Sequence, residues 1–595
     1  MERCDVQPRS DVMVARLLLR IAAPCLALVL GLVATPAQAQ DARGNFTARP
    51  LASLQPAIFR GGLVVGQETR SARIGADILA RGGNAVDAAV ATGFAMAVTY
   101  PRAGNLGGGG FMVIHLAERG EDIAIDYRET APAATTRDIF LGSDGKPDPR
   151  KSRASALGIG VPGTVAGLAL ALEKYGSGKF TLADLLQPAI RLADEGLPVE
   201  DDVADTLGDA VAQFAPWPAS AKIFLHPDGT ALREGETLVQ RDLAATLRAI
   251  ADRGPRAFYE GPIAEKLVDA IKAAGGIMTV EDLKSYQPTL RAPVRGRYRG
   301  YEVVSMPLPS SGGIVLAESL NILENFDLKA IGADSPDTAH LLVEAMKRGY
   351  ADRARYLGDP AAVDAPLQRL LSKSYARHLA STIDMQRATP ASAITALADA
   401  WREGQNTTHF SVVDRFGNAV SNTYTLNFSY GLGLVADGTG VLLNNELDDF
   451  TAAVGASNAF GLVGYEANLP GPGKRPLSSM TPTIVLKDGK PWLVTGTPGG
   501  SRIISAVLQI IVDTIDLDMN LAAAVARPRL HHQWLPDEVR IEHGFPLEIA
   551  EALRARGHKV VEPLGQTSAN SIEVTPDGFA GAPDPRSRGS FAAGF

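Results

Sequence analysis

One stretch, residues 406–427, constrains the fold of this chain more than any other. β-Branched and aromatic residues flank a glycine-containing connection at residues 414–418, a pattern that predicts a β-hairpin. The hairpin begins with Asn406-Thr407-Thr408. Cleavage of the Asn406–Thr407 bond would give Thr407 an α-amine with a reference pKa of about 7.7–8.0, which can act as a base on the hydroxyl of the same residue. An ordinary edge hairpin fits the same pattern, so other motifs must decide between the two interpretations.

The first 39 residues differ in character from the rest. Arg16 and Arg20 precede an apolar run at residues 21–33, and Ala37-Gln38-Ala39 follows. This layout predicts a secretory signal peptide that is removed after Ala39, and the run is short for a membrane span. We therefore expect a periplasmic or secreted protein without a stable membrane anchor; an uncleaved anchor is the alternative.

Cysteine usage and charge exclude several classes of function. Cys4 and Cys25 both lie in the predicted signal peptide, so the mature chain would have no disulfide, thiolate metal site or cysteine nucleophile. The chain has 58 basic and 66 acidic residues and no basic run, which makes nucleic acid a poor partner. The nine histidines are scattered without an HExxH motif, and His531 and His532 would point to opposite faces of a strand. We expect no metal and no cofactor.

Hydrophobic periodicity predicts helices in the first part of the chain and strands mixed with helices in the second. A glycine pair at residues 82–83 divides the first helical stretch, Thr181 begins a capping box, and Ser335 and Pro336 begin a helix that runs to Tyr356. The remaining predicted elements are strands at 61–65, 111–116, 122–127, 301–306, 440–443, 483–487 and 492–495, helices at 164–174, 240–253, 262–274, 503–515 and 521–526, and a closing strand, helix and strand at 539–542, 546–556 and 560–562. These elements favour helices packed on both faces of stacked sheets.

A glycine-rich segment at residues 158–163 matches the GxGxxG dinucleotide fingerprint. No apolar strand leads into the segment, and Pro162 occupies a variable position, so a loop that leads into a helix is the better interpretation. A nucleotide-binding oxidoreductase would depend on this segment.

Three further groups of residues suit acyl transfer to an amino acid derivative. The turn Thr497-Pro498-Gly499-Gly500-Ser501-Arg502 precedes a helix, where backbone N–H groups can stabilise an oxyanion; a tight turn with no ligand is the alternative. Asp448-Asp449 and Arg128 are candidates for binding an ammonium and a carboxylate. His409 shares a strand face with Thr407 if alternation holds, and it is equally consistent with a core histidine.

Five motifs together closely resemble the bacterial γ-glutamyltransferases, in the order and at spacings similar to those of that family, from about Arg60 to the C-terminus. The motifs are Asp126-Tyr127-Arg128-Glu129, Asn406-Thr407-Thr408-His409-Phe410-Ser411, Leu443-Asn444-Asn445-Glu446-Leu447-Asp448-Asp449-Phe450, Lys474-Arg475-Pro476-Leu477-Ser478-Ser479-Met480 and Thr497-Pro498-Gly499-Gly500-Ser501-Arg502.

The resemblance implies an N-terminal-nucleophile hydrolase with a four-layer αββα sandwich. Such a protein cleaves itself into a large subunit, residues 40–406, and a small subunit, residues 407–595, which form one compact unit. The implied reaction cleaves the γ-glutamyl amide of glutathione and transfers the acyl group to water or to an amino acid or peptide acceptor.

The resemblance also implies roles for individual residues. Thr407 would be nucleophile and base, and Thr425 would support it by hydrogen bonding. The substrate's α-carboxylate would bind Arg128, Ser478 and Ser479, its α-amino group would bind Asn427, Glu446 and Asp449, and the N–H groups of Gly499 and Gly500 would form the oxyanion hole.

Residues 449–476 resemble the flap that covers the glutamyl pocket in bacterial members. Its expected gate tyrosine is Phe460 in this chain. A phenyl ring cannot donate a hydroxyl hydrogen bond to Asn427, so we expect a looser lid.

Two alternative functions are consistent with the same motifs. A glutaryl or cephalosporin acylase of the same fold would act on a substrate without an α-amino group, which would leave Asp449 with little to do. A non-enzymatic periplasmic amino acid-binding protein would keep the Asn406–Thr407 bond intact.

Overall fold

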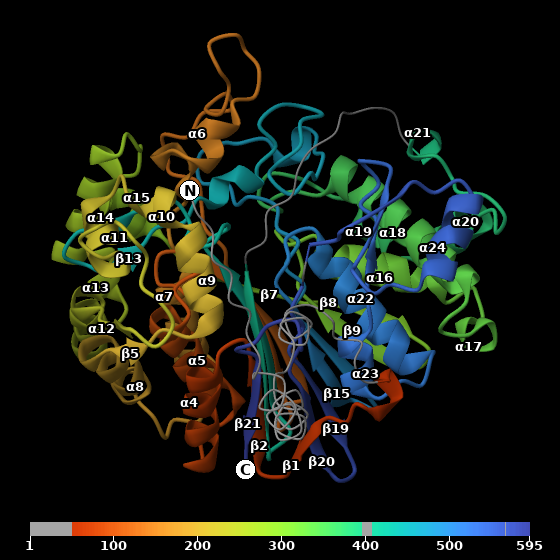
Figure 1. Ribbon diagram of the computed structural model, residues 1–595, viewed down its shortest axis with the longest axis horizontal. Coiled ribbons are helices and arrows are strands. Elements are labelled where there is room, and N and C mark those ends of the chain that lie inside the picture. Colours follow the sequence, from red (N-terminus) through yellow and green to blue (C-terminus); the bar gives the residue numbers. More distant parts are fainter. Residues whose placement is uncertain (1–49, 395–406, 566) are drawn as a thin grey trace, which may run out of the picture. The chain divides into compact units, whose positions relative to one another are not determined.

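The computed structural model describes residues 50–394, 407–565 and 567–595. Residues Leu51–Phe595 form one compact unit that mixes helices and sheets, with two seven-stranded sheets at its centre (Figure 1). The signal peptide and Asn406 lie outside the described residues.

Both large sheets are antiparallel. In spatial order, the first contains β1 (Ala57–Phe59), β20 (Gly578–Ala582), β19 (Ser571–Thr575), β15 (Lys490–Thr495), β14 (Thr483–Lys487), β9 (Tyr301–Ser305) and β8 (Val294–Tyr298). The second contains β21 (Phe591–Gly594), β2 (Gly62–Gly66), β10 (Thr408–Asp414), β11 (Ala419–Thr425), β3 (Gly109–Leu116), β4 (Glu121–Tyr127) and β7 (Thr289–Arg291).

The predicted hairpin is confirmed as β10 and β11, at the centre of the second sheet. Its register runs from Thr408 opposite Tyr424 to Val413 opposite Ala419. Strand β2 pairs with the outer edge of β10, and β3 pairs with the outer edge of β11. One sheet therefore contains strands from both sides of residue 407, with the β10–β11 hairpin inserted between β2 and β3.

Side-chain alternation places each sheet between two hydrophobic layers. In β2, Leu63 and Val65 pack between the sheets, whereas Val64 packs against helices on the other side. In β14, Ile484 packs between the sheets and Val485 against a second set of helices. Because both faces are buried, these strands are apolar along most of their length.

Two groups of helices cover the outer faces of the sheets, and Figure 1 shows them on opposite sides of the strands. The group that shares a core with the second sheet contains α4 (Thr69–Ala80), α5 (Ala85–Thr99), α7 (Thr164–Tyr175), α8 (Leu182–Glu195), α9 (Asp201–Asp209), α10 (Val211–Phe214), α11 (Pro218–Phe224), α12 (Arg241–Arg253), α13 (Arg256–Tyr259), α14 (Pro262–Ala273) and α15 (Val280–Ser285). The group that shares a core with the first sheet contains α16 (Gly312–Leu323), α17 (Leu328–Ile331), α18 (Pro336–Tyr356), α19 (Leu367–Leu370), α20 (Lys373–Ser381), α21 (Ala391–Ile394), α22 (Arg502–Ile515), α23 (Leu521–Ala526) and α24 (Leu547–Ala555).

Local helix signals in the sequence are confirmed. Thr181 forms a capping box with Asp184 at the start of α8. Ser335 caps α18 by accepting a hydrogen bond from the Asp337 N–H, with Pro336 at the first helical position. These signals succeed because a cap depends only on residues within one turn.

The glycine-rich segment at residues 158–163 is a loop that leads into α7, as predicted. A short helix, α6 (Pro149–Arg153), and a 3-10 turn, η4 (Ala156–Gly158), precede it instead of a strand. A Cβ on Gly158 would lie 2.1 Å from the Ser152 carbonyl oxygen, and one on Gly163 would lie 2.0 Å from the Tyr127 carbonyl oxygen, so close packing against the backbone accounts for glycines in this segment. The strand that a dinucleotide site needs is absent from this described segment.

The prediction that a strand near residue 560 closes the chain is wrong. After β18 (Val560–Val561), strands β19, β20 and β21 add to both large sheets. The sequence of β20 is Gly-Phe-Ala-Gly-Ala, which lacks β-branched residues. Its glycine at 581 sits where a Cβ would lie 3.0 Å from Ala592, so tight packing between the sheets overrides strand propensity.

Within the described ranges, none of the helices is both long enough and apolar enough to cross a membrane.

Asp414 ties the hairpin turn to the helix layer. Its buried carboxylate accepts hydrogen bonds from the N–H groups of Phe416 and Asn418 at 2.8 and 3.0 Å, and from the Ala85 N–H at the start of α5 at 2.8 Å. We predict that Asp414→Ala lowers the free energy of unfolding by about 2 kcal/mol, because the buried Ala85 N–H and two partly buried N–H groups of the turn lose their acceptor. Urea denaturation measures this loss.

The matched control is Asp577→Ala, at the exposed turn between β19 and β20. A surface aspartate of this kind should change the free energy by less than about 0.5 kcal/mol. Equal losses in the two variants would contradict the role given to Asp414.

Candidate active site

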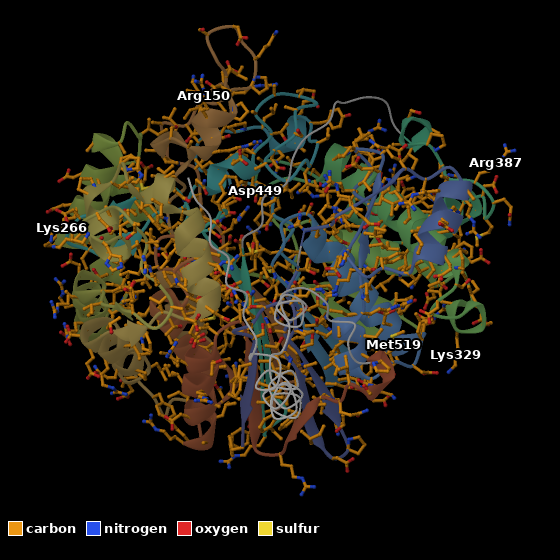
Figure 2. All side chains as sticks on the ribbon, viewed as in Figure 1. Arg150, Lys266, Lys329, Arg387, Asp449 and Met519 are labelled. Atoms are coloured by element: carbon orange, nitrogen blue, oxygen red, sulfur yellow. The ribbon has the colours of Figure 1, made fainter. Side chains whose placement is uncertain are left out.

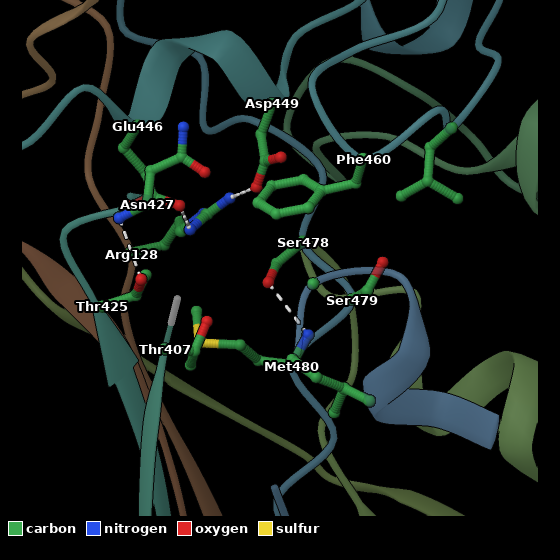
Figure 3. Close-up of a pocket in the computed structure, with 13 residues that line it drawn as sticks. Arg128, Thr407, Thr425, Asn427, Glu446, Asp449, Phe460, Ser478, Ser479 and Met480 are labelled. Carbon is green, nitrogen blue, oxygen red and sulfur yellow. Dashed lines mark hydrogen bonds and ion pairs between the residues drawn. The ribbon is translucent and has the colours of Figure 1, made fainter. Parts of the chain in front are cut away.

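A pocket of about 280 Å³ lies where the central hairpin opens (Figure 3). Thr407 directly precedes β10, and Thr425 is the last residue of β11. With the exception of Gly499, the predicted site residues that the structure describes line this one pocket. Its lining contains Arg128, Thr407, Thr425, Asn427, Glu446, Asp449, Phe460, Leu462, Ser478, Ser479, Met480, Gly500 and Ile503.

The backbone turns sharply after β11 and presents Asn427 to the pocket. Asn427 has a φ of 76°, a left-handed conformation that asparagine tolerates better than most residues. The Thr425 hydroxyl oxygen accepts a hydrogen bond from the Asn427 N–H at 2.8 Å, and the Asn427 side chain donates to the Asn445 carbonyl at 3.0 Å. These bonds hold the turn beside Thr407.

A buried guanidinium organises the far end of the pocket. Arg128 follows β4, and its two terminal nitrogens contact Glu446 and Asp449, the ends of the 3-10 turn η5 (Glu446–Asp449). Its Nε donates to the Pro476 carbonyl at 3.2 Å. Glu129 adds a third carboxylate, 3.8 Å from Arg128 Nη1. Figure 2 shows Asp449 between the two groups of helices rather than at the periphery.

This cluster holds three carboxyl groups around one guanidinium. Burial raises the pKa of Glu129 to about 7, and it also raises the pKa values of Glu446 and Asp449. Neither carboxyl oxygen of Glu129 has a hydrogen-bond partner among the described residues, and the same holds for Glu446 Oε2. An ammonium group placed here would supply the missing positive charge and donors.

Two serines form the opposite wall. Ser478 Oγ accepts a hydrogen bond from the Met480 N–H at 3.0 Å. Ser479 Oγ accepts one at 3.3 Å from Arg353, a buried residue of α18. Desolvation lowers the pKa of Arg353 to about 10, so it remains a cation at neutral pH. The sequence prediction missed Arg353, because a single arginine in a helix pattern reads as a surface charge.

The predicted glycine turn lies directly before α22. Gly499 and Gly500 have φ values of 134° and 58°, and a Cβ on Gly500 would lie 2.3 Å from the Phe460 ring. Neither backbone N–H donates a hydrogen bond within the part of the chain that the structure describes. Gly500 lines the pocket, whereas Gly499 lines a neighbouring pocket that also contains Thr407.

Phe460 is buried and covers the pocket. Its ring meets the Phe428 ring edge-on at 6.2 Å, and its carbonyl accepts a hydrogen bond from Gln533 at 3.1 Å. Asn458 donates to Asp449 at 3.0 Å and accepts from the Phe460 N–H at 2.9 Å. The sequence prediction missed Phe428, Asn458 and Gln533, and the looser lid stays a prediction.

His409 is a core residue, which resolves the choice left open by the sequence. It is fully buried, with Nδ1 at 2.8 Å from the Thr423 hydroxyl and Nε2 at 3.0 Å from the Ser411 hydroxyl. Desolvation lowers the pKa of His409 to about 3, so the ring is neutral, and it does not line the pocket.

One cluster of potential metal ligands occurs among the described residues, namely His340, Glu344 and His558. Glu344 already binds two cations, Lys347 at 3.3 Å and Arg348 at 2.5 Å. The two imidazoles bind each other, with 2.8 Å between His340 Nδ1 and His558 Nε2. The adjacent positive charges disfavour a bound metal cation, so we interpret the cluster as structural.

Comparison with known proteins agrees with the motif resemblance. The γ-glutamyltranspeptidase family model matches residues 71–594. A glutathione hydrolase proenzyme of Escherichia coli (strain K12) is 51% identical over 91% of this chain and 93% of its own length. The acylase ACY 1 proenzyme of Pseudomonas sp. (strain V22) is 39% identical over 88% of this chain and 92% of its own.

A similar structure is that of a cephalosporin acylase from Bacillus halodurans. It aligns with a TM-score of 0.80 at 28% identity and covers 93% of this chain and 99% of the acylase. The matched family model spans the hairpin, the charge cluster and the glycine turn. The chain therefore belongs to the γ-glutamyltranspeptidase family.

Proposed function

We propose that the chain is an autoprocessed γ-glutamyltransferase that cleaves the γ-glutamyl amide of glutathione and related compounds. The acyl group would form an ester with Thr407 and pass to water or to an amino acid or peptide acceptor. One observation carries this proposal: a single pocket contains Thr407 at one end and the charge cluster around Arg128 at the other. Family membership supports the same reaction.

The head group of a γ-glutamyl donor would bind through its two charges. Its α-ammonium would lie between Glu446 and Asp449, with Asn427 beside it, where carboxylates are in excess. Its α-carboxylate would bind Arg128, Ser478 and Ser479. Binding both charges at one end orients the γ-carbonyl toward Thr407, which lowers the entropic cost of the reaction.

The reaction would use both the α-amine and the hydroxyl of Thr407. After scission of the Asn406–Thr407 bond, the new amine takes the hydroxyl proton as Oγ attacks the γ-carbonyl. The N–H groups of Gly499 and Gly500 would stabilise the oxyanion. The amide C–N bond breaks, the departing nitrogen takes a proton from the Thr407 ammonium, and an ester remains. An acceptor amine or water then attacks the ester and restores the hydroxyl.

Processing would leave a large subunit of residues 40–406 and a small subunit of residues 407–595. Interleaved strands on either side of residue 407 support a stable processed unit. We assign the two sheets with their two helix groups to the αββα sandwich of N-terminal-nucleophile hydrolases. The signal peptide predicted from the sequence supports a location in the periplasm or outside the cell.

The acylase alternative has support from the acylase relatives but explains the pocket less well. A glutaryl side chain carries no ammonium, so the buried excess of carboxylates would face an apolar chain and remain uncompensated.

Processing gives the first test of this proposal. Denaturing mass spectrometry of the purified protein should detect two chains that meet between residues 406 and 407. Thr407→Ala should remain one inactive chain, because it lacks the hydroxyl. Thr408→Val is the matched control: the Thr408 hydroxyl has no partner among the described residues, so this near-isosteric change should permit cleavage. A single intact chain in active wild-type protein would rule out the mechanism and favour a binding protein.

Head-group charge gives a second prediction. Asp449→Asn should lower kcat/KM for γ-glutamyl-4-nitroanilide about 30-fold, because a neutral amide replaces one charge-assisted contact with the ammonium. Glutaryl-4-nitroanilide, which lacks that ammonium, is the matched substrate and should lose less than about three-fold. Equal losses would contradict ammonium binding at Asp449.

The pH dependence of head-group binding gives a third prediction. Only ionised carboxyls attract the ammonium, and burial raises their pKa values, that of Glu129 to about 7. The ratio of kcat/KM for the γ-glutamyl over the glutaryl donor should therefore fall as pH drops through about 7. This ratio cancels the titration of the Thr407 amine, which both donors need.

Glu129→Gln tests whether the pKa values of the clustered carboxyls depend on one another. The charge of Glu129 raises the pKa of Glu446, so its removal should move the fall in the ratio to lower pH. A fall at unchanged or higher pH would argue against coupled carboxyls at this site.

A further inference from the structure

A second pocket, with about 430 Å³ of space, adjoins the first at Thr407. The two pockets share Thr407, and the glycine pair divides between them, with Gly500 in the first and Gly499 in the second. Residues from before and after the proposed cleavage point form its walls, among them Gln67, Arg102 and Ser587. A carbonyl at Thr407 would therefore lie where the two pockets meet.

The geometry of an amide determines what such a second pocket can hold. The acyl half and the amine half of an amide extend to opposite sides of the carbonyl carbon. With the glutamyl head at Arg128 and the carbonyl at Thr407, the first pocket is filled by the acyl half. The departing amine, and any amine that attacks the ester afterwards, must then occupy the second pocket.

Arg102 is a cation, and not all of its guanidinium nitrogens are used in hydrogen bonds to described residues. Its Nη1 donates to Asp202 at 3.1 Å, and its guanidinium lies 5.6 Å from the centre of the Tyr100 ring, whose hydroxyl also binds Asp202. Within the described part of the chain, its Nε and Nη2 donate no hydrogen bond. The other arginine in the wall, Arg586, is saturated by Glu542, Asp584 and backbone carbonyls.

Two neutral groups in the wall also lack partners among the described residues. The side chain of Gln67 accepts from the His409 N–H at 3.3 Å, but its amide nitrogen donates to nothing. The Ser587 hydroxyl is buried without a hydrogen bond. Buried polar groups are normally satisfied, so unsatisfied groups around a pocket indicate a polar ligand.

We propose that Arg102 determines acceptor specificity by binding the terminal carboxylate of the dipeptide or amino acid that occupies the second pocket. The proposal rests on the function proposed above. In the first step the departing amine carries this carboxylate away from the donor. In the second step an acceptor uses the same contact, and its amine attacks the carbonyl of the Thr407 ester. The C–Oγ bond breaks, and the proton that the attacking amine loses passes through the Thr407 amine to Oγ, which restores the hydroxyl.

An acceptor pair tests the proposal on the processed enzyme. With γ-glutamyl-4-nitroanilide as donor, transfer to glycylglycine is compared with transfer to glycylglycinamide, which lacks the carboxylate. Wild type should prefer glycylglycine. In Arg102→Gln the ratio of acceptor kcat/KM values should fall about ten-fold, because a charge-assisted contact is lost. Arg102→Lys, which keeps the charge, should restore part of the ratio.

The matched control is Arg588→Gln. Arg588 pairs with Asp201 and Asp205 of the same helix that carries Asp202, but it lies outside the pocket, so the ratio should stay at the wild-type value. If Arg102 only holds that helix, both acceptors would lose equally, and an unchanged ratio overturns the proposal.

If the Arg102 variants do not cleave themselves, the wild-type enzyme alone still tests the proposal. Equal use of the two acceptors, or donor turnover that neither acceptor accelerates, would overturn the second pocket as a carboxylate site. Absence of any donor turnover by wild type would instead refute the proposed γ-glutamyl chemistry.

Discussion

The buried pairing of Arg128 with carboxylates is the interaction on which the site depends. Removing a guanidinium from water costs several kcal/mol unless close counter-charges compensate it. Glu446 and Asp449 supply that compensation from a turn more than 300 positions away in the chain, and the Pro476 carbonyl supplies a further acceptor. One side chain thereby brings three distant segments together and shapes the pocket between them.

The same cluster is electrostatically incomplete. Glu129 makes the third carboxylate around one guanidinium, and burial raises the pKa values of all three acids. A stable fold tolerates this arrangement because protonation can relieve it. A ligand with an ammonium group would relieve it as well, and the proposed selection of an amino acid head group rests on this.

Local patterns predicted the elements well where a few adjacent residues determine them. The hairpin on either side of Gly417, the cap at Ser335 and the capping box at Thr181 depend on residues within one turn or one connection. The C-terminal strands were missed because packing between the sheets requires small residues such as Gly581. Arg353 was missed because its burial depends on the elements around α18, which helix periodicity does not report.

The sequence by itself determined the type of most elements, the candidate nucleophile Thr407 and the order of the motifs, since each depends on residues that are close together in the chain. Only the tertiary structure decided that Arg128 meets Asp449, that His409 is a core residue and that Arg102 lines a pocket with Thr407. The physical reason is that such contacts join segments whose proximity depends on how sheets and helices pack. Periodicity along one segment indicates which face is buried, but it carries no information about the partner that the face meets.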